Sequence, residues 1–65
     1  MVKEIKYCLE NEKRAEIIYL TNDGRFTQRI IKVLEIKYDK VLAYCFAKRK
    51  IRYFNLNNIL SIIPR

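Results

Sequence analysis

The spacing of hydrophobic residues changes near residue 14. In residues 2–11 the apolar side chains fall at positions i, i+3, i+6 and i+7, namely Val2, Ile5, Cys8 and Leu9. This spacing places them on one stripe and predicts a short helix that ends near Asn11. From Arg14 onward, β-branched and aromatic residues form short runs separated by turn residues, which predicts strands.

Five strands are predicted after the helix. They cover residues 15–20, 26–38, 41–47, 51–54 and 59–63. Asn22-Asp23-Gly24 predicts a tight hairpin, because Asp-Gly supplies the positive φ angles of the favoured hairpin turns. The other connections are predicted at 39–40, at the basic segment 48–50, and at 55–58, where three asparagines favour a tight turn.

The second predicted strand changes phase in its middle. Phe26, Gln28 and Ile30 alternate on one face, whereas Ile31 and Val33 belong to the other. Because side chains alternate with a period of two, this switch predicts a bend or a bulge. The strand at 41–47 is apolar in both phases, which is typical of a central strand.

One helix followed by five short-connected strands predicts a mainly β fold: a small five-stranded antiparallel SH3/Sm-like barrel preceded by one short N-terminal helix. Closing a sheet into a barrel removes exposed strand edges, and the helix would plug one open end. With 65 residues, the chain is expected to bury about 60% of its unfolded surface. Residues 1–65 are therefore predicted to form a single domain.

The composition argues against an enzyme. The chain has no histidine and one glycine, which excludes Ser-His or Cys-His catalysis and a glycine-rich phosphate loop. Cys8 and Cys45 alone are too few for a zinc site, so they are predicted to be free, buried thiols in a reducing cytosol. No catalytic residue, metal site, cofactor, signal peptide or membrane span is predicted.

The charge is more informative. Fourteen lysines and arginines face seven acidic residues, for a net charge of +7. Lys48, Arg49, Lys50 and Arg52 form one cluster, and the long strand region adds Arg25, Arg29 and Lys32. The rings of Tyr44, Phe46, Tyr53 and Phe54 lie among these cations. Small barrels bind single strands with this combination, since cations contact phosphates and rings stack on bases. A solvated hairpin tip beside core rings is the alternative.

Residues 43–59 resemble the second half of a WYL domain. The similarity is carried by Ala43-Tyr44-Cys45, Arg49, Arg52, Phe54, Leu56 and Ile59, and more weakly by Ala15, Ile17, Tyr19, Gly24 and Arg29. Asp39-Lys40-Val41 replaces the triplet that names the family, a proline near Val33 is absent, and Asn57-Asn58 replaces a usual Asp-Arg. The chain is also similar to small YolD-like proteins.

The resemblance implies an Sm-like barrel that senses ligands or contacts nucleic acids and nucleotides within regulatory proteins. It also implies anion-contacting roles for Arg29, Arg49 and Arg52, with Tyr44 as the matching aromatic. Together with the charge pattern, it predicts a divergent stand-alone WYL-like module. The predicted ligand-binding residues are Arg29, Arg49, Arg52, Lys48, Lys50, Tyr44 and Tyr53.

The predicted function is non-catalytic binding of single-stranded RNA or DNA, or of a nucleotide-like anion, in a bacterial or mobile-element regulatory context. The alternative is a protein–protein interaction or oligomeric assembly module, in which strands 26–36 and 59–63 form the contact surfaces. An acidic protein and a second copy of the chain are therefore further candidate partners, and no membrane partner is predicted.

Overall fold

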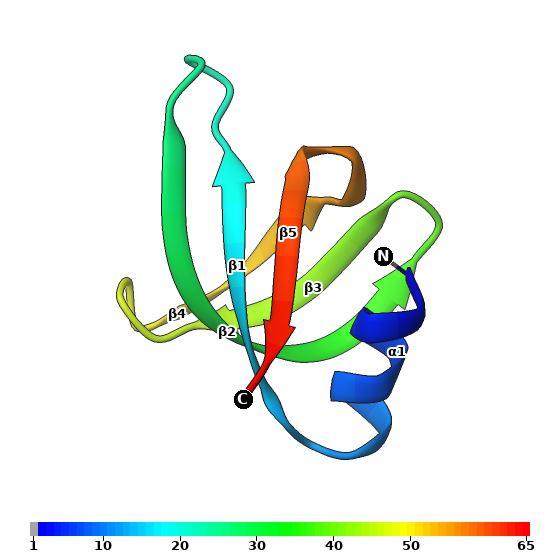
Figure 1. The fold of residues 1–65 in the computed structure, drawn as a ribbon. Coiled ribbons are helices and arrows are strands. Elements are labelled where there is room, and N and C mark those ends of the chain that lie inside the picture. The colour runs from blue at the N-terminus through cyan, green and yellow to red at the C-terminus, as the bar shows by residue number, and fades with distance from the viewer. Residues whose placement is uncertain (1) are drawn as a thin grey trace.

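The computed structural model describes residues 2–65, which form one antiparallel sheet with a helix packed against it (Figure 1). The elements in chain order are α1 (Val2–Glu10), β1 (Arg14–Leu20), β2 (Phe26–Lys37), β3 (Lys40–Cys45), β4 (Lys50–Asn55), the 3-10 helix η1 (Leu56–Asn58) and β5 (Ile59–Pro64). The order of strands in the sheet is β4-β3-β2-β1-β5. The predicted mainly β, barrel-like fold with an N-terminal helix is confirmed.

The strand boundaries agree with the prediction to within one residue except at the end of β3, and three differences have a structural reason. β3 ends at Cys45 rather than at residue 47, because the chain turns over residues 46–49, where Arg49 has a φ of 55°. The predicted turn at 55–58 contains one turn of 3-10 helix, η1. β5 continues to Pro64, which a strand at the edge of a sheet tolerates because one side of its backbone needs no ladder hydrogen bond.

β2 is the long curved strand on which the barrel is built (Figure 1). Its first part pairs with β1 and its second part with β3. The predicted irregularity is present, as a register shift between Val33 and Glu35. The phase switch has a different cause: Ile31 and Val33 point into the core, whereas Phe26 lies on the outer face and is 70% exposed.

The core lies between the curved sheet and α1. Ile5 and Cys8 of the helix are buried together with Ile17, Ile31 and Val41 from three strands. The helix packs against β2, β5 and β1. Two apolar residues three positions apart on α1 therefore complete the core, as their helical spacing predicts.

Side chains link β1 to β4, although β1 lies three places from β4 in the sheet. The rings of Tyr19 and Phe54 meet edge to face with centroids 5.0 Å apart. The backbone N–H of Asn55 donates to the Tyr19 hydroxyl at 3.0 Å. These contacts hold the curved sheet together at the end that carries the candidate site.

The alkylation rates of the two cysteines would measure how easily α1 separates from the core. Both are free and buried, and burial raises the pKa of the Cys8 thiol, which lowers its thiolate fraction. In single-cysteine variants, Cys8→Ala and Cys45→Ala, we expect slow alkylation by iodoacetamide. Cys8 should react faster than Cys45, because a short helix opens at a lower free-energy cost than a central strand. Equal rates would show that both thiols become exposed only in global unfolding.

Candidate anion-binding site

The inner face of β2 changes from apolar to polar along its length. Ile31 and Val33 are buried in the core, and Thr27 and Arg29 follow the same phase toward the β1–β2 hairpin. Arg29 is half-buried opposite Ile17 of β1. The alternation of the strand thus places a guanidinium at the end of the core, where an aliphatic side chain would otherwise pack.

Two aromatic rings flank this guanidinium. Its central carbon lies 5.8 Å from the ring centroid of Tyr19 and 5.7 Å from that of Phe54. These distances are within the range of cation–π attraction. The rings therefore position the Arg29 charge and offset part of its desolvation, which gives Arg29 a structural role beside any functional one.

The hydrogen bonding of Arg29 is incomplete. Its Nε donates to the Thr27 hydroxyl at 3.2 Å. Its Nη1 is enclosed and has no hydrogen-bond partner within residues 2–65. An unsatisfied buried donor costs about 1–3 kcal/mol, and such groups in native proteins call for an explanation. An anion that supplies the missing acceptor is one.

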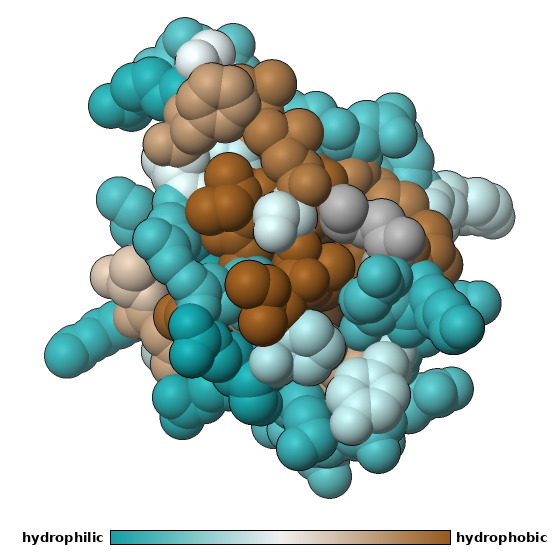
Figure 2. All heavy atoms as spheres, viewed as in Figure 1, coloured by the Kyte–Doolittle hydropathy of each residue, from teal (hydrophilic) through white to brown (hydrophobic). Residues whose placement is uncertain are grey.

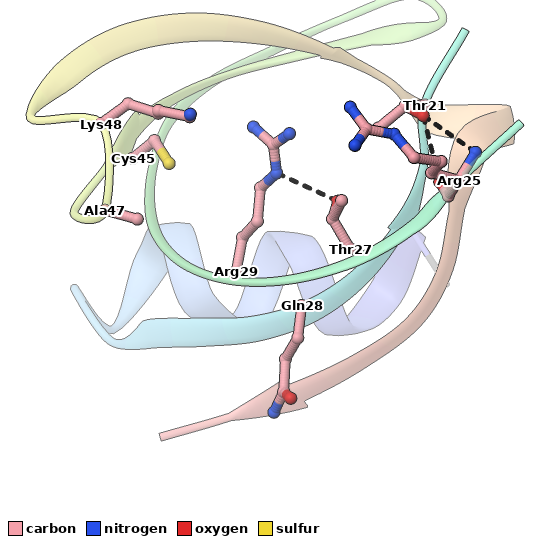
Figure 3. Close-up of a pocket in the computed structure, with 8 residues that line it drawn as sticks. All are labelled: Thr21, Arg25, Thr27, Gln28, Arg29, Cys45, Ala47 and Lys48. Carbon is pink, nitrogen blue, oxygen red and sulfur yellow. Dashed lines mark hydrogen bonds between the residues drawn. The ribbon is translucent and has the colours of Figure 1, made fainter. Parts of the chain in front are cut away.

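Three cationic side chains converge on a hollow of about 300 Å³ beside Arg29. Figure 3 shows Lys48 reaching in from the β3–β4 turn, Arg25 from the hairpin and Arg29 from β2, while Gln28 points to the other side of the strand. The lining residues are Thr21, Arg25, Thr27, Gln28, Arg29, Cys45, Ala47 and Lys48. In the described part of the chain, no carboxylate lines this hollow.

Asp23, an acid that pairs with Arg25, is held by the hairpin itself. It forms an ion pair with Arg25, with Nε and Oδ2 3.1 Å apart, and accepts a hydrogen bond from the Thr21 hydroxyl. That hydroxyl bond, followed by the charge of Arg25, keeps the pKa of Asp23 below its usual range. Both partners are largely exposed. The pair is therefore weak and leaves Arg25 available to a stronger anion.

A second hollow of about 180 Å³ adjoins the first. Arg29 and Thr21 belong to the walls of both hollows. Arg52 supplies a further cation from β4, where it pairs with Ala43. The remaining lining residues are Tyr19, Asn22, Tyr53, Phe54 and Asn55. Again the lining residues, all within the described part of the chain, include no carboxylate.

The structure brings together four of the seven predicted site residues: Arg29, Lys48, Arg52 and Tyr53. Arg49 and Lys50 are exposed and belong to neither hollow. Tyr44 alternates with the buried Ala43 and Cys45, so its ring lies on the outer side, where it packs against Phe46 with centroids 5.0 Å apart. Ligand contact by any of the seven stays a prediction.

Arg25 is a candidate site residue that the sequence prediction did not select. A signal for it exists in the sequence. Arg25 and Thr27 precede Arg29 by four and two positions, so all three share the phase of the buried Ile31. Reading the strand as one alternating face would have placed Arg25 at the same end of the barrel as Arg29.

The described residues give no indication of a metal site or of a membrane-spanning helix. Residues 2–65 contain no group of three or more acidic, cysteine or histidine side chains arranged to hold a metal ion. In the same range, no helix is long and apolar enough to cross a membrane. The concentration of positive charge around two adjoining hollows is thus the chemical feature that indicates a function.

Comparisons with known proteins show the fold. No protein-family model matches the chain. No curated protein matches it either. Among solved structures, the chain is similar to part of the proteasome accessory factor B/C (PafBC) of Arthrobacter aurescens, with a TM-score of 0.89 and 22% sequence identity. The match covers 98% of this chain and 11% of that protein. At this identity the likeness establishes a shared fold.

A stability measurement separates a structural from a binding role for Arg29. We expect Arg29→Met to leave the free energy of unfolding in urea unchanged or about 1 kcal/mol higher, because it removes an unsatisfied buried donor while filling similar space. As a control, Tyr19→Phe removes the hydroxyl that accepts from Asn55. It should lower stability by about 1–2 kcal/mol. A loss of that size in Arg29→Met would show that the contacts of Arg29 with Tyr19, Phe54 and Thr27 stabilise the fold by more than the unsatisfied donor costs.

Proposed function

We propose that this chain is a non-catalytic binding module whose cation-lined end binds the phosphates of a single-stranded nucleic acid or a nucleotide. The observation that carries the proposal is the convergence of Arg25, Arg29 and Lys48 on one hollow without a lining carboxylate. Like charges this close repel one another, and an anion turns that repulsion into attraction. The enclosed Nη1 of Arg29 adds an unused donor.

The surroundings of the hollows favour a single strand over a duplex. The described chain has one α-helix, and its apolar side is buried against the sheet. It therefore offers no helix to insert into a major groove. Tyr53 is one of the residues that line the second hollow, and it is 55% exposed. Its side chain alternates with those of Arg52 and the buried Phe54, so its ring lies on the outer side of β4, and we propose that an unpaired base leaving the hollow stacks on it.

The resemblance to WYL domains supports the same proposal from the sequence. Arg29 and Arg52 are two of the three positions to which that resemblance assigns anion contact, and both line the second hollow. The fold shared with part of PafBC is compatible with this reading. We propose, on these grounds, that the module acts within a bacterial or mobile-element regulatory system.

Paired substitutions with equal charge change test the proposed site. We expect Arg25→Gln with Lys48→Gln to weaken binding of oligo-deoxythymidine by about tenfold or more, because charge-assisted hydrogen bonds contribute about 1.5–3 kcal/mol. The matched control is Arg49→Gln with Lys50→Gln, which lies outside both hollows and should change affinity by much less. Fluorescence anisotropy over a salt series would measure both pairs.

The salt series has its own expected outcome. If Arg25, Arg29, Lys48 and Arg52 together neutralise two to four phosphates, log K should fall against log salt with a slope of about −1.4 to −3 for a single strand. Duplex DNA should bind more weakly than single-stranded DNA or RNA. Equal losses in the two variant pairs, with equal affinity for all three nucleic acids, would instead mean that the net charge attracts any polyanion.

A second candidate function, self-association, is favoured by the outer face of the sheet. Figure 2 shows apolar side chains over the centre of this face, along β5 and β1. They alternate with the core residues and include Ile18, Leu20, Phe26, Ile30, Leu60 and Ile63. Phe26 is 70% and Ile63 53% exposed, and a patch of this kind on a small protein marks a contact surface.

A second copy is the partner that the charges of this face favour. Glu16 is almost buried there and forms an ion pair with Arg65, so the middle of the face is neutral. Because each copy carries a charge of +7, two copies repel wherever their cations meet. Packing two neutral outer faces together avoids that contact and leaves both hollows open. We propose a weak, two-fold symmetric dimer on this basis.

Sedimentation velocity over a concentration series tests the dimer. We expect association that persists or strengthens as salt is added, since it is apolar and opposed by net charge. Phe26→Ser with Ile63→Ser should give a monomer at every concentration. Tyr38→Ser is the control, because Tyr38 is 98% exposed in the β2–β3 turn away from this face. A monomer in all three proteins would contradict this candidate.

A further inference from the structure

We infer that the site holds two consecutive phosphates of one strand, one in each hollow, with the Arg29 guanidinium between them. This inference rests on the proposed function and specifies it further. The two hollows adjoin along Arg29 and Thr21, which belong to both linings. Two adjoining cationic hollows fit a ligand that carries anionic groups one after another.

Each hollow has cations of its own besides the shared arginine. Arg25 and Lys48 line the first hollow, and Arg52 lines the second. Because Arg52 lines a different hollow from Arg25 and Lys48, a single phosphate in either hollow leaves the cations that line only the other hollow without an anion. Two phosphates, in contrast, give every cation a partner.

The guanidinium of Arg29 is suited to a position between two anions. It is planar and carries five N–H donors in a fixed fork, so anions can approach it along more than one edge. Within residues 2–65 its Nε donates to the Thr27 hydroxyl, and its Nη1 has no hydrogen-bond partner. The rings of Tyr19 and Phe54 contact the Arg29 guanidinium from within the protein and hold its plane in position.

The volumes of the hollows bear on which part of a nucleotide occupies them. Volumes of about 300 and 180 Å³ lie at or below the lower limit of pockets that enclose a whole drug-sized ligand. Each hollow is large enough for a phosphate, and the inferred arrangement leaves the sugar and base outside. Tyr53 is a lining residue of the second hollow, and its half-exposed ring lies on the outer side of β4, where a base directed away from the hollow would meet it.

The test compares thymidine dinucleotide TpT, which has one phosphodiester, with the trinucleotide TpTpT, which has two. Binding is followed by chemical shifts of the nitrogen-labelled protein. We expect TpTpT to bind about tenfold more tightly than TpT, because the second phosphate gains a charge-assisted contact with Arg52. Thymidine diphosphate, whose two phosphates are closer together, should not show this gain.

Two variants assign the phosphates to their hollows. Arg52→Gln should bring TpTpT down to the affinity of TpT without changing TpT, which keeps the hollow with more cations. Lys48→Gln should weaken both ligands. Lys37→Gln, an exposed position at the end of β2 outside both hollows, is the control for loss of one charge.

The outcomes separate this inference from the proposed function. A gain of only about twofold in affinity, which corresponds to about 0.4 kcal/mol of binding free energy, is the statistical effect of offering two equivalent phosphates to one site. That result, with Lys48→Gln still weakening both ligands, would overturn the two-phosphate site and retain the proposed function. A diphosphate that binds as tightly as TpTpT would overturn the assignment to a strand. No response to Lys48→Gln with either ligand would overturn both proposals.

Discussion

The position of Arg29 on the inner face of β2 is the constraint on which the candidate site depends. An inward-facing guanidinium cannot be buried completely in so small a core, because an isolated charge in an apolar interior is unstable. This end of the barrel is hollow, and the rings of Tyr19 and Phe54 lie beside the charge. The contact between these rings and the hydrogen bond from Asn55 to Tyr19 also link β1 to β4. The structural and the binding roles of Arg29 are thus two consequences of one placement.

The core and the site are successive segments of one strand face. Along the inner side of β2, Val33 and Ile31 pack into the core, and Arg29 and Thr27 form the walls of the hollow. The helix contributes Ile5 and Cys8 to the core. A barrel of this size therefore divides its interior into an apolar region that stabilises the fold and a polar end that remains open to ligands.

Local patterns explain which features the sequence could predict. The helix, the five strands and the Asp-Gly hairpin depend on spacing and turn chemistry within a few residues. The inward face of β3 could not be predicted in this way, because the strand is apolar in both phases, and it is the fold that buries Val41, Ala43 and Cys45 and places Tyr44 outside. The site depends on more distant relations. Lys48 reaches the hollow because Cys45 pairs with Ile31 across β2 and β3.

The turn at 46–49 shows why the basic cluster could not be resolved by sequence. Lys48 and Arg49 are adjacent, yet Lys48 lines the hollow and Arg49 is exposed outside it. The backbone of Arg49 adopts a φ of 55°, which reverses the chain and ends the regular alternation of side chains. No periodicity marks that reversal. The irregularity of β2 was predicted, but its position between Val33 and Glu35 depends on the curvature that β2 needs to pair with both β1 and β3.

The two candidate surfaces are compatible because they lie on opposite faces of the same strand. Arg29 points inward and Phe26 outward on β2, so a partner on the outer face leaves the cation-lined hollows uncovered. A two-fold dimer through the outer face would present one pair of hollows on each side of the assembly. A nucleic-acid strand long enough to reach both would gain affinity through the higher effective concentration of the second site. Self-association would then reinforce binding rather than compete with it, and the phase switch within β2 would be the sequence feature that allows both.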